Sequence, residues 1–169
     1  WLGWFGFNPG STTVANKSAV DLLGDQTARA PDGISHQRTL CKEEWLTPLY
    51  IVRALGEFDL DPCAPSADRR PWETAKNYYT IHDNGLIKPW HGRVWCNPPY
   101  GNETKKFLAK MAEHQNGIAL VFARTDTVMF HEHVFGRASG ILFIRGRLSF
   151  CDYQGKAGRF NSGAPSVLI

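Results

Sequence analysis

The sequence predicts an α/β domain with a mixed, mostly parallel sheet. Two apolar runs of strand length, at 94–96 and 117–123, are continuous rather than alternating, which is typical of strands buried on both faces. Between them, residues 102–114 carry apolar side chains at helical spacing, which indicates a helix. Polar blocks follow three apolar runs and begin at Asp61, Asn97 and Arg124. Because parallel strands that end at one edge of a sheet form a common cleft, we expect one binding site at that edge.

Shorter patterns place the remaining elements. Helices are expected over 48–55 and 127–135, and strands over 58–60, 78–80, 141–145, 147–150 and 166–169. The strands at 141–145 and 147–150 would form a bent pair around Gly146.

The composition is that of an ordinary globular protein. The chain has 169 residues, enough for one domain with a sizeable core, and its net charge of +3 permits binding to a polyanion without requiring it. The four cysteines lack a C-x-x-C pair, which argues against a zinc ribbon or a disulfide framework and favours a reducing compartment. We expect no metal site, because no ligand pattern surrounds the histidines. We also expect no membrane partner, because no apolar run approaches the roughly 20 residues that span a bilayer.

Three parts are expected along the chain. Residues 1–16 form an aromatic, Gly-rich arm without periodicity, which is similar to a short piece of the ammonium-transporter family and which we interpret as extraneous. Residues 17–41 are polar and rich in small residues, as in a linker, and residues 42–169 form the domain. The missing initiator Met and the apolar end at Ile169 indicate a fragment or a processed product.

The stretch Asn97-Pro98-Pro99-Tyr100 is the main candidate for chemistry. It follows an apolar run, and because neither proline has an N–H the strand ladder stops and the backbone is stiff. Asn97 offers an amide oxygen, and Tyr100 offers a flat ring for stacking. Together with a proline carbonyl, these groups can hold an amino group on a planar heterocycle. An ordinary proline turn with a surface tyrosine is the alternative.

This motif resembles the Asn/Asp/Ser-Pro-Pro-Tyr/Phe/Trp signature of amino-methyltransferases. Further blocks occur around it in one order: Trp45-Leu46-Thr47-Pro48, Glu57-Phe58-Asp59-Leu60-Asp61-Pro62-Cys63-Ala64, Asp83-Asn84-Gly85-Leu86, Arg124-Thr125-Asp126-Thr127 and Gly146-Arg147-Leu148-Ser149-Phe150. This order resembles the phage-type Dam-like DNA N6-adenine methyltransferases over residues 43–169. The resemblance implies a reduced Rossmann-like, S-adenosylmethionine-dependent methyltransferase fold with a double-stranded DNA substrate. It also implies the cytoplasm of a bacterial or phage-infected cell.

The resemblance assigns catalysis to Asn97, Pro98, Pro99 and Tyr100. The target is the N6 amine of an adenine, which cannot be reached inside a duplex, so the base is expected to flip out and stack on Tyr100.

Two blocks are candidates for the cofactor. Thr47 is expected as an N-cap with Pro48 at the first helical position, where free N–H groups suit a carboxylate. The resemblance places this block beside the methionine end of S-adenosylmethionine. Asp61, Pro62 and Cys63 lie just past a strand end, where an acidic side chain accepts bonds from amino or hydroxyl groups. For Asp61, an N-cap role is the alternative.

One further residue and one departure concern the same site. By resemblance, Asp83 reads the adenine amino group of the cofactor, although a plain turn aspartate fits the sequence as well. The glycine-rich turn usual after the Asp61 strand is absent, and Pro65-Ser66-Ala67-Asp68 stands in its place. Part of the usual Rossmann-like half is therefore expected to be reduced to loops.

The candidates for DNA contact are basic. Arg124 follows the strand at 117–123, while Lys156 and Arg159 lie in a Gly-rich stretch at 152–163 that we interpret as a mobile loop able to close on DNA.

Other functions remain open from the sequence. Asn-Pro-Pro-Tyr also occurs in protein-glutamine and RNA-guanine methyltransferases, whose targets are planar amides or amines. A catalytically inactive nucleic-acid-binding module is the third possibility, since the glycine-rich turn is missing.

Overall fold

The computed structural model describes residues 45–159 and 161–169. The predicted arm at 1–16 and linker at 17–41 lie outside these residues. The elements in chain order are α2 (Leu49–Leu55), β1 (Leu60–Asp61), the 3-10 helix η1 (Ala67–Arg69), β2 (Asn77–Tyr78), β3 (Val94–Cys96), α3 (Asn102–His114), β4 (Gly117–Phe122), α4 (Val128–His133), β5 (Leu142–Phe143) and β6 (Ser166–Leu168).

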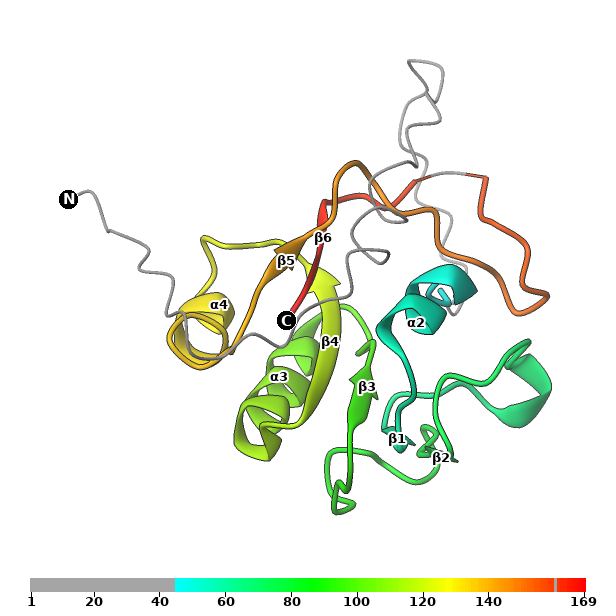
Figure 1. Ribbon diagram of the computed structural model, residues 1–169, viewed down its shortest axis with the longest axis horizontal. Coiled ribbons are helices and arrows are strands. Elements are labelled where there is room, and N and C mark those ends of the chain that lie inside the picture. Colours follow the sequence, from blue (N-terminus) through cyan, green and yellow to red (C-terminus); the bar gives the residue numbers. More distant parts are fainter. Residues whose placement is uncertain (1–44, 160) are drawn as a thin grey trace.

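The six strands form one mixed sheet in the order β2-β1-β3-β4-β6-β5 (Figure 1). The pairings of β1 with β2, β1 with β3 and β3 with β4 are parallel, whereas β6 is antiparallel to both β4 and β5. The predicted α/β class with a mixed sheet is therefore confirmed. Chain order reverses at β1, because β2 lies on one side of it and β3 and β4 lie on the other.

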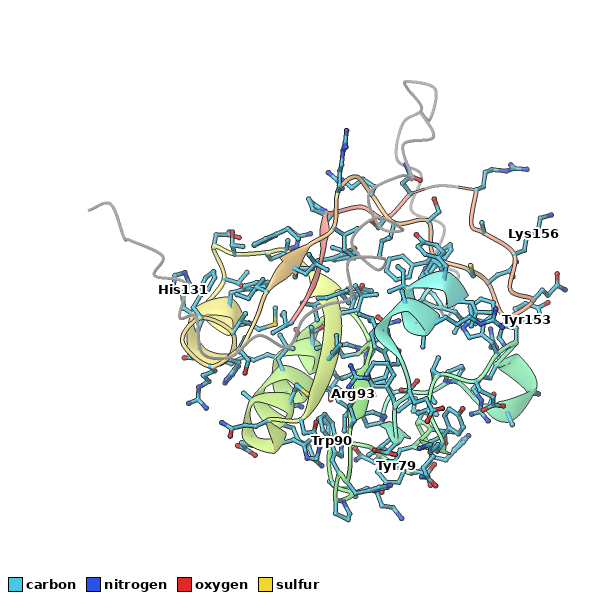
Figure 2. The ribbon with its side chains drawn as sticks, viewed as in Figure 1. Tyr79, Trp90, Arg93, His131, Tyr153 and Lys156 are labelled. Carbon is cyan, nitrogen blue, oxygen red and sulfur yellow. The ribbon has the colours of Figure 1, made fainter. Side chains whose placement is uncertain are left out.

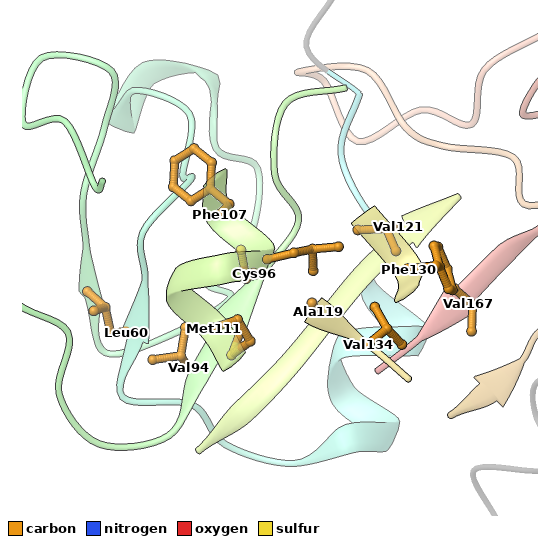
Figure 3. Close-up of a cluster of buried hydrophobic side chains, with 11 residues drawn as sticks. Leu60, Val94, Cys96, Phe107, Met111, Ala119, Val121, Phe130, Val134 and Val167 are labelled. Atoms are coloured by element: carbon orange, nitrogen blue, oxygen red, sulfur yellow. The ribbon is translucent and has the colours of Figure 1, made fainter. Parts of the chain in front are cut away.

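The central strands are buried on both faces and separate two apolar clusters. In β3, Val94 and Cys96 belong to the cluster under α3 and α4 (Figure 3), while Trp95 belongs to the cluster under α2. This alternation follows from the two-residue repeat of a strand. Helices thus cover both faces, which explains why β3 and β4 appear in the sequence as continuous apolar runs.

Several predicted boundaries shift. The strand expected at 58–60 is β1 at 60–61, and the strand expected at 78–80 is β2 at 77–78. The expected strand at 147–150 is wrong, because the Leu148 and Phe150 carbonyls accept bonds from the returning residues Ser162 and Gly158, both at 2.7 Å, rather than from β5.

The start of α2 also differs from the prediction. Pro48 takes the N-cap position with ψ of 135°, the helix begins at Leu49, and no side chain caps it. Thr47 therefore lies one residue outside the expected place, since the residue before a proline is biased towards extended backbone. Its hydroxyl is left for another partner.

A lysine holds the loop between β2 and β3. The Lys110 ammonium, on α3, donates to the carbonyl oxygens of Gly85 at 3.0 Å, Leu86 at 2.7 Å and Lys88 at 2.5 Å. It also lies 5.2 Å from the centroid of the Trp90 ring. One cation thus satisfies three carbonyls that no ladder reaches.

We expect Lys110→Met to lower the free energy of unfolding by about 1–3 kcal/mol, because the carbonyls lose a charged donor while the apolar stem is kept. Lys106→Met is the matched control on the same helix, since Lys106 makes only an exposed i,i+3 pair with Glu103 and its loss is expected to cost under about 0.5 kcal/mol. Urea unfolding measures both. An equal loss of stability in the two variants would contradict a stabilising role for the bonds from Lys110 to the three carbonyls.

Candidate active site

A pocket of about 920 Å³ opens beyond the carboxyl ends of β1 and β3. This is the point where chain order reverses, and ligands of open α/β sheets bind at such points. Among the predicted site residues, the structure brings these to its wall: Thr47, Asp61, Pro62, Cys63, Asn97, Pro98, Pro99 and Tyr100. The pocket joins the two blocks predicted for cofactor and catalysis.

The amide of Asn97 has one end bound and the other end free. Its Nδ2 donates to the Trp45 carbonyl at 3.3 Å. Its Oδ1 is buried without a hydrogen-bond partner in the described part of the chain. Four buried side-chain atoms there lack partners, and two of them, on Asn97 and Thr47, belong to pocket residues. An acceptor and a hydroxyl are thus left for a ligand.

The segment that binds Asn97 is itself anchored. Leu46 exchanges two backbone hydrogen bonds with Cys151, each 2.8 Å long. This isolated antiparallel bridge lies directly between Trp45, which holds the Asn97 amide, and Thr47, which lines the pocket. Residues 45–47 therefore form a strap over the end of β3.

The two prolines lead from β3 directly into α3. The Pro99 carbonyl accepts a bond from the Thr104 hydroxyl at 2.7 Å, and the same hydroxyl accepts the Gly101 N–H at 3.1 Å. Gly101 has φ of 123°, which favours glycine. Among the described residues, none donates to the Pro98 carbonyl. That carbonyl is a second acceptor beside Asn97.

Tyr100 lies against the end of β4. Its ring stacks on Phe122 with centroids 4.0 Å apart and meets the edge of Phe150 at 6.3 Å. Burial raises the pKa of the Tyr100 phenol, so it stays protonated. The residue is nevertheless 37% exposed, which leaves part of the ring accessible from the pocket.

Asp61 is a buried carboxyl group, only 4% exposed. It accepts the Thr74 hydroxyl at 2.6 Å and the Cys63 N–H at 3.0 Å. Burial raises the pKa of Asp61 to about 6, against the lowering effects of these two bonds and of Arg70. Next to it, the Cys63 sulfur lies 3.7 Å from that of Cys96, and burial raises the pKa of the Cys63 thiol. At neutral pH the pocket therefore holds the Asp61 carboxylate beside the neutral thiol of Cys63.

The comparison with protein families shows which family the chain belongs to. The model of the family described as DNA N-6-adenine-methyltransferase (Dam) matches residues 34–169, well over half of the chain. The chain belongs to this family. The predicted resemblance is confirmed, and the match begins within the segment interpreted as a linker. Comparison with curated proteins and with solved structures gave no match.

Two further findings concern membrane-spanning helices and clusters of metal ligands. In the residues that the structure describes, no helix is both long and apolar enough to cross a membrane. Over the same residues, no three His, Cys, Asp or Glu side chains gather where a metal ion could be held.

Two predicted cofactor residues of the methyltransferase lie off the pocket wall. Pro48 is buried and does not line the pocket. The Asp83 carboxylate bonds within its own turn, where Oδ2 accepts the Thr80 N–H and hydroxyl, both at 2.9 Å, and these bonds lower its pKa. Its neighbour Asn84 lines the pocket instead. The cofactor role of Asp83 stays a prediction, and its observed contacts are those of a turn aspartate.

The predicted DNA contacts are exposed and lie outside the pocket: Arg124, Lys156 and Arg159. The segment expected as a mobile loop begins with a hydrogen-bonded turn, in which Asp152 Oδ1 accepts the N–H groups of Gln154 and Lys156, both at 2.9 Å. Lys156 and Tyr153 project from this turn at the side of the molecule (Figure 2).

Sequence reasoning assigned no role to several residues on the outer wall of the pocket. These residues come from η1 and the irregular segment that follows it: Arg69, Arg70, Trp72 and Thr74. The turn that begins at Asp152 also contacts this wall. The centroid of the Tyr153 ring lies 5.3 Å from the guanidinium carbon of Arg69. Such a segment has no sequence periodicity that would predict its position. Only Thr74 has a contact that links it to a predicted site residue, through its hydrogen bond to Asp61.

The buried carboxyl makes a stability prediction with a defined sign. The folded pKa of Asp61, about 6, lies above the ordinary value of 3.8. Its stabilising contribution is therefore present below about pH 4 and is lost as the pH rises through 6. Asp61→Asn removes the buried charge, so we expect the free energy of unfolding at pH 7.5 to rise by about 1–3 kcal/mol.

The control for this measurement is Asp59→Asn, in the residue just before β1. The Arg93 N–H and Lys76 lower the pKa of Asp59, so its neutralisation is expected to reduce stability at pH 7.5. Urea unfolding of both variants from pH 4 to 8 measures the effects. A loss of stability in Asp61→Asn at pH 7.5 would contradict the buried-charge interpretation.

Proposed function

We propose that this member of the Dam family transfers a methyl group from S-adenosylmethionine to the N6 amine of an adenine in double-stranded DNA. The target base would flip into the end of the pocket formed by residues 97–100. The observation that carries this proposal is the buried Asn97 Oδ1, an acceptor at the pocket without a partner. A buried acceptor left unpaired costs about 1–3 kcal/mol, so its retention favours a role in binding a donor.

The residues at the pocket fit the cofactor. S-adenosylmethionine supplies an electrophilic methyl group on a sulfonium. Asp61 offers a carboxylate to the amino or hydroxyl groups of the cofactor, and Thr47 offers a buried hydroxyl without a partner. Pro62 and Cys63 complete the wall beyond β1. The position at the reversal of chain order supports a reduced Rossmann-like fold, with η1 and irregular chain where the glycine-rich turn would stand.

The chemistry assigned to residues 97–100 is positioning. The adenine amine is a weak nucleophile because its lone pair is delocalised into the ring. Acceptance of one N–H by Asn97 Oδ1 and of the other by the Pro98 carbonyl favours a pyramidal nitrogen, whose lone pair forms the new N–C bond. The S–C bond breaks, its electron pair stays on sulfur, and the amine proton leaves to solvent. The exposed part of the Tyr100 ring stacks on the flipped base.

A product assay tests the proposed function and its alternatives. The protein is incubated with labelled S-adenosylmethionine and duplex DNA, RNA or protein, and the methylated residue is identified. N6-methyladenine in DNA is expected. Label in RNA or on a glutamine would overturn the proposed substrate. Absence of cofactor binding by calorimetry would indicate an inactive nucleic-acid-binding module.

Substitutions at Asp61 are expected to change cofactor affinity and protein stability in different ways. We expect Asp61→Ala and Asp61→Asn to weaken S-adenosylmethionine binding at least tenfold, about 1.4 kcal/mol, because both remove the carboxylate. Asp61→Asn is nevertheless expected to be the more stable protein at pH 7.5. Calorimetric titration measures the affinity, and wild-type affinity in both folded variants would remove Asp61 from the site.

The catalytic proposal predicts a rate effect at Asn97. Asn97→Ala is expected to lower kcat by on the order of 10²–10³, with cofactor and DNA affinity near wild type, because the lost acceptor acts mainly in the transition state. Asn97→Asp is the matched control, since it keeps an acceptor oxygen and is expected to lose less. If Asn97 is only part of a turn, Asn97→Ala methylates adenine at the parent rate, and that result would sink the mechanism.

A further inference from the structure

The charge of this chain is concentrated in its last segment. Residues 141–169 contain the basic residues Arg145, Arg147, Lys156 and Arg159 and the single acidic residue Asp152, a net charge of 4 − 1 = +3. The whole chain also has a net charge of +3, so the rest of the sequence is balanced. The only acidic side chain in this segment has one carboxylate oxygen bonded to two backbone N–H groups of its own turn.

Strand direction brings part of this charge to the edge that holds the pocket. Both β4 and β5 are antiparallel to β6, so they point the same way, and β3 is parallel to β4. Arg124 follows β4, and Arg145 and Arg147 follow β5; we call these three residues the arginine edge. They therefore leave the sheet at the same edge as Asn97. The stacking of Tyr100 on Phe122, at the end of β4, joins the catalytic motif to this side.

Among the residues that the structure describes, none supplies a counter-charge to the arginine edge. All three residues are exposed, and no described carboxylate forms an ion pair with any of them. Arg147 donates once, to the Ser162 carbonyl at 3.3 Å. Other arginines differ, since Arg70 lies 3.6 Å from the centroid of the Tyr78 ring and Arg93 donates to two carbonyls. The arginine edge thus keeps its charge for an external anion.

We infer that the phosphate backbone of duplex DNA docks on the arginine edge, with Arg145 and Arg147 as contacts that the motif comparison does not assign. The inference rests on the proposed function for the choice of DNA as the anion. It adds the direction from which the duplex approaches, which is the β4–β5 side of the pocket rather than the η1 side. Gly146, with φ of 80°, allows the tight turn between the two arginines. Exposed guanidinium groups in such a turn suit phosphate oxygens.

The test is the salt dependence of DNA binding, measured by fluorescence anisotropy with a labelled duplex. The double variant Arg145→Gln with Arg147→Gln is expected to raise Kd at least tenfold. It should also reduce the slope of log K against log salt by about 2, because two phosphate contacts are lost. The control is Arg53→Gln with Arg137→Gln, which removes the same charge from two exposed arginines near the opposite edge. Its slope is expected to equal that of the wild type.

Two results would overturn the inference. An unchanged slope in the Arg145/Arg147 variant would show that these residues contact no phosphate, which includes the case where the edge binds an acidic protein instead. An equal reduction in the control would show that only total charge matters. Circular dichroism establishes that the variants fold. Because the measurement needs no cofactor and no turnover, a wild-type protein that fails to methylate adenine removes the proposed reaction without deciding this result.

Discussion

The site depends on the abrupt end of β3. Pro98 and Pro99 have no N–H, so the ladder that joins β3 to β1 and β4 cannot extend beyond Cys96. The chain then reaches the first residue of α3 at Asn102, and the Thr104 hydroxyl ties the Pro99 carbonyl to the helix start. A short link between two packed elements has little freedom. The amide of Asn97 and the Pro98 carbonyl are therefore placed by the fold before any ligand binds, which is the preorganisation that catalysis by positioning requires.

The pocket concentrates groups that disfavour folding. The unpaired oxygens of Asn97 and Thr47 and the buried carboxyl of Asp61 each lack the solvation they would have in water. Loop carbonyls away from the pocket do find donors, since Lys110 on α3 donates hydrogen bonds to three of them. Two of the four unpartnered buried atoms of the described chain lie at the pocket, beside a buried carboxyl group, and a place where several such costs coincide is expected to be functional.

The parts of the fold that the sequence predicted are those with an internal repeat. The helix at 102–114 and the strand within 117–123 were identified from side-chain spacing, and Asn97 was identified from the loss of N–H donors after an apolar run. The burial of Asp61 was not predictable in this way, because it depends on Thr74 across an irregular segment. The strand predicted at 147–150 is wrong for a related reason. Leu148 and Phe150 form an apolar pattern because they pack into the core while their carbonyls bind a returning loop, and the sequence does not distinguish this from a strand.

The strap at 45–47 links Asn97, at the end of β3, to the basic segment that follows β5. Trp45 binds the Asn97 amide through its carbonyl, and the next residue, Leu46, is held by its two bonds to Cys151. Cys151 lies between the arginines that follow β5 and the turn that carries Lys156. The orientation of the Asn97 amide is therefore tied to the segment richest in positive charge. A single bridge outside the sheet is among the least stable parts of a fold, so a contact that orders this segment would also hold the strap.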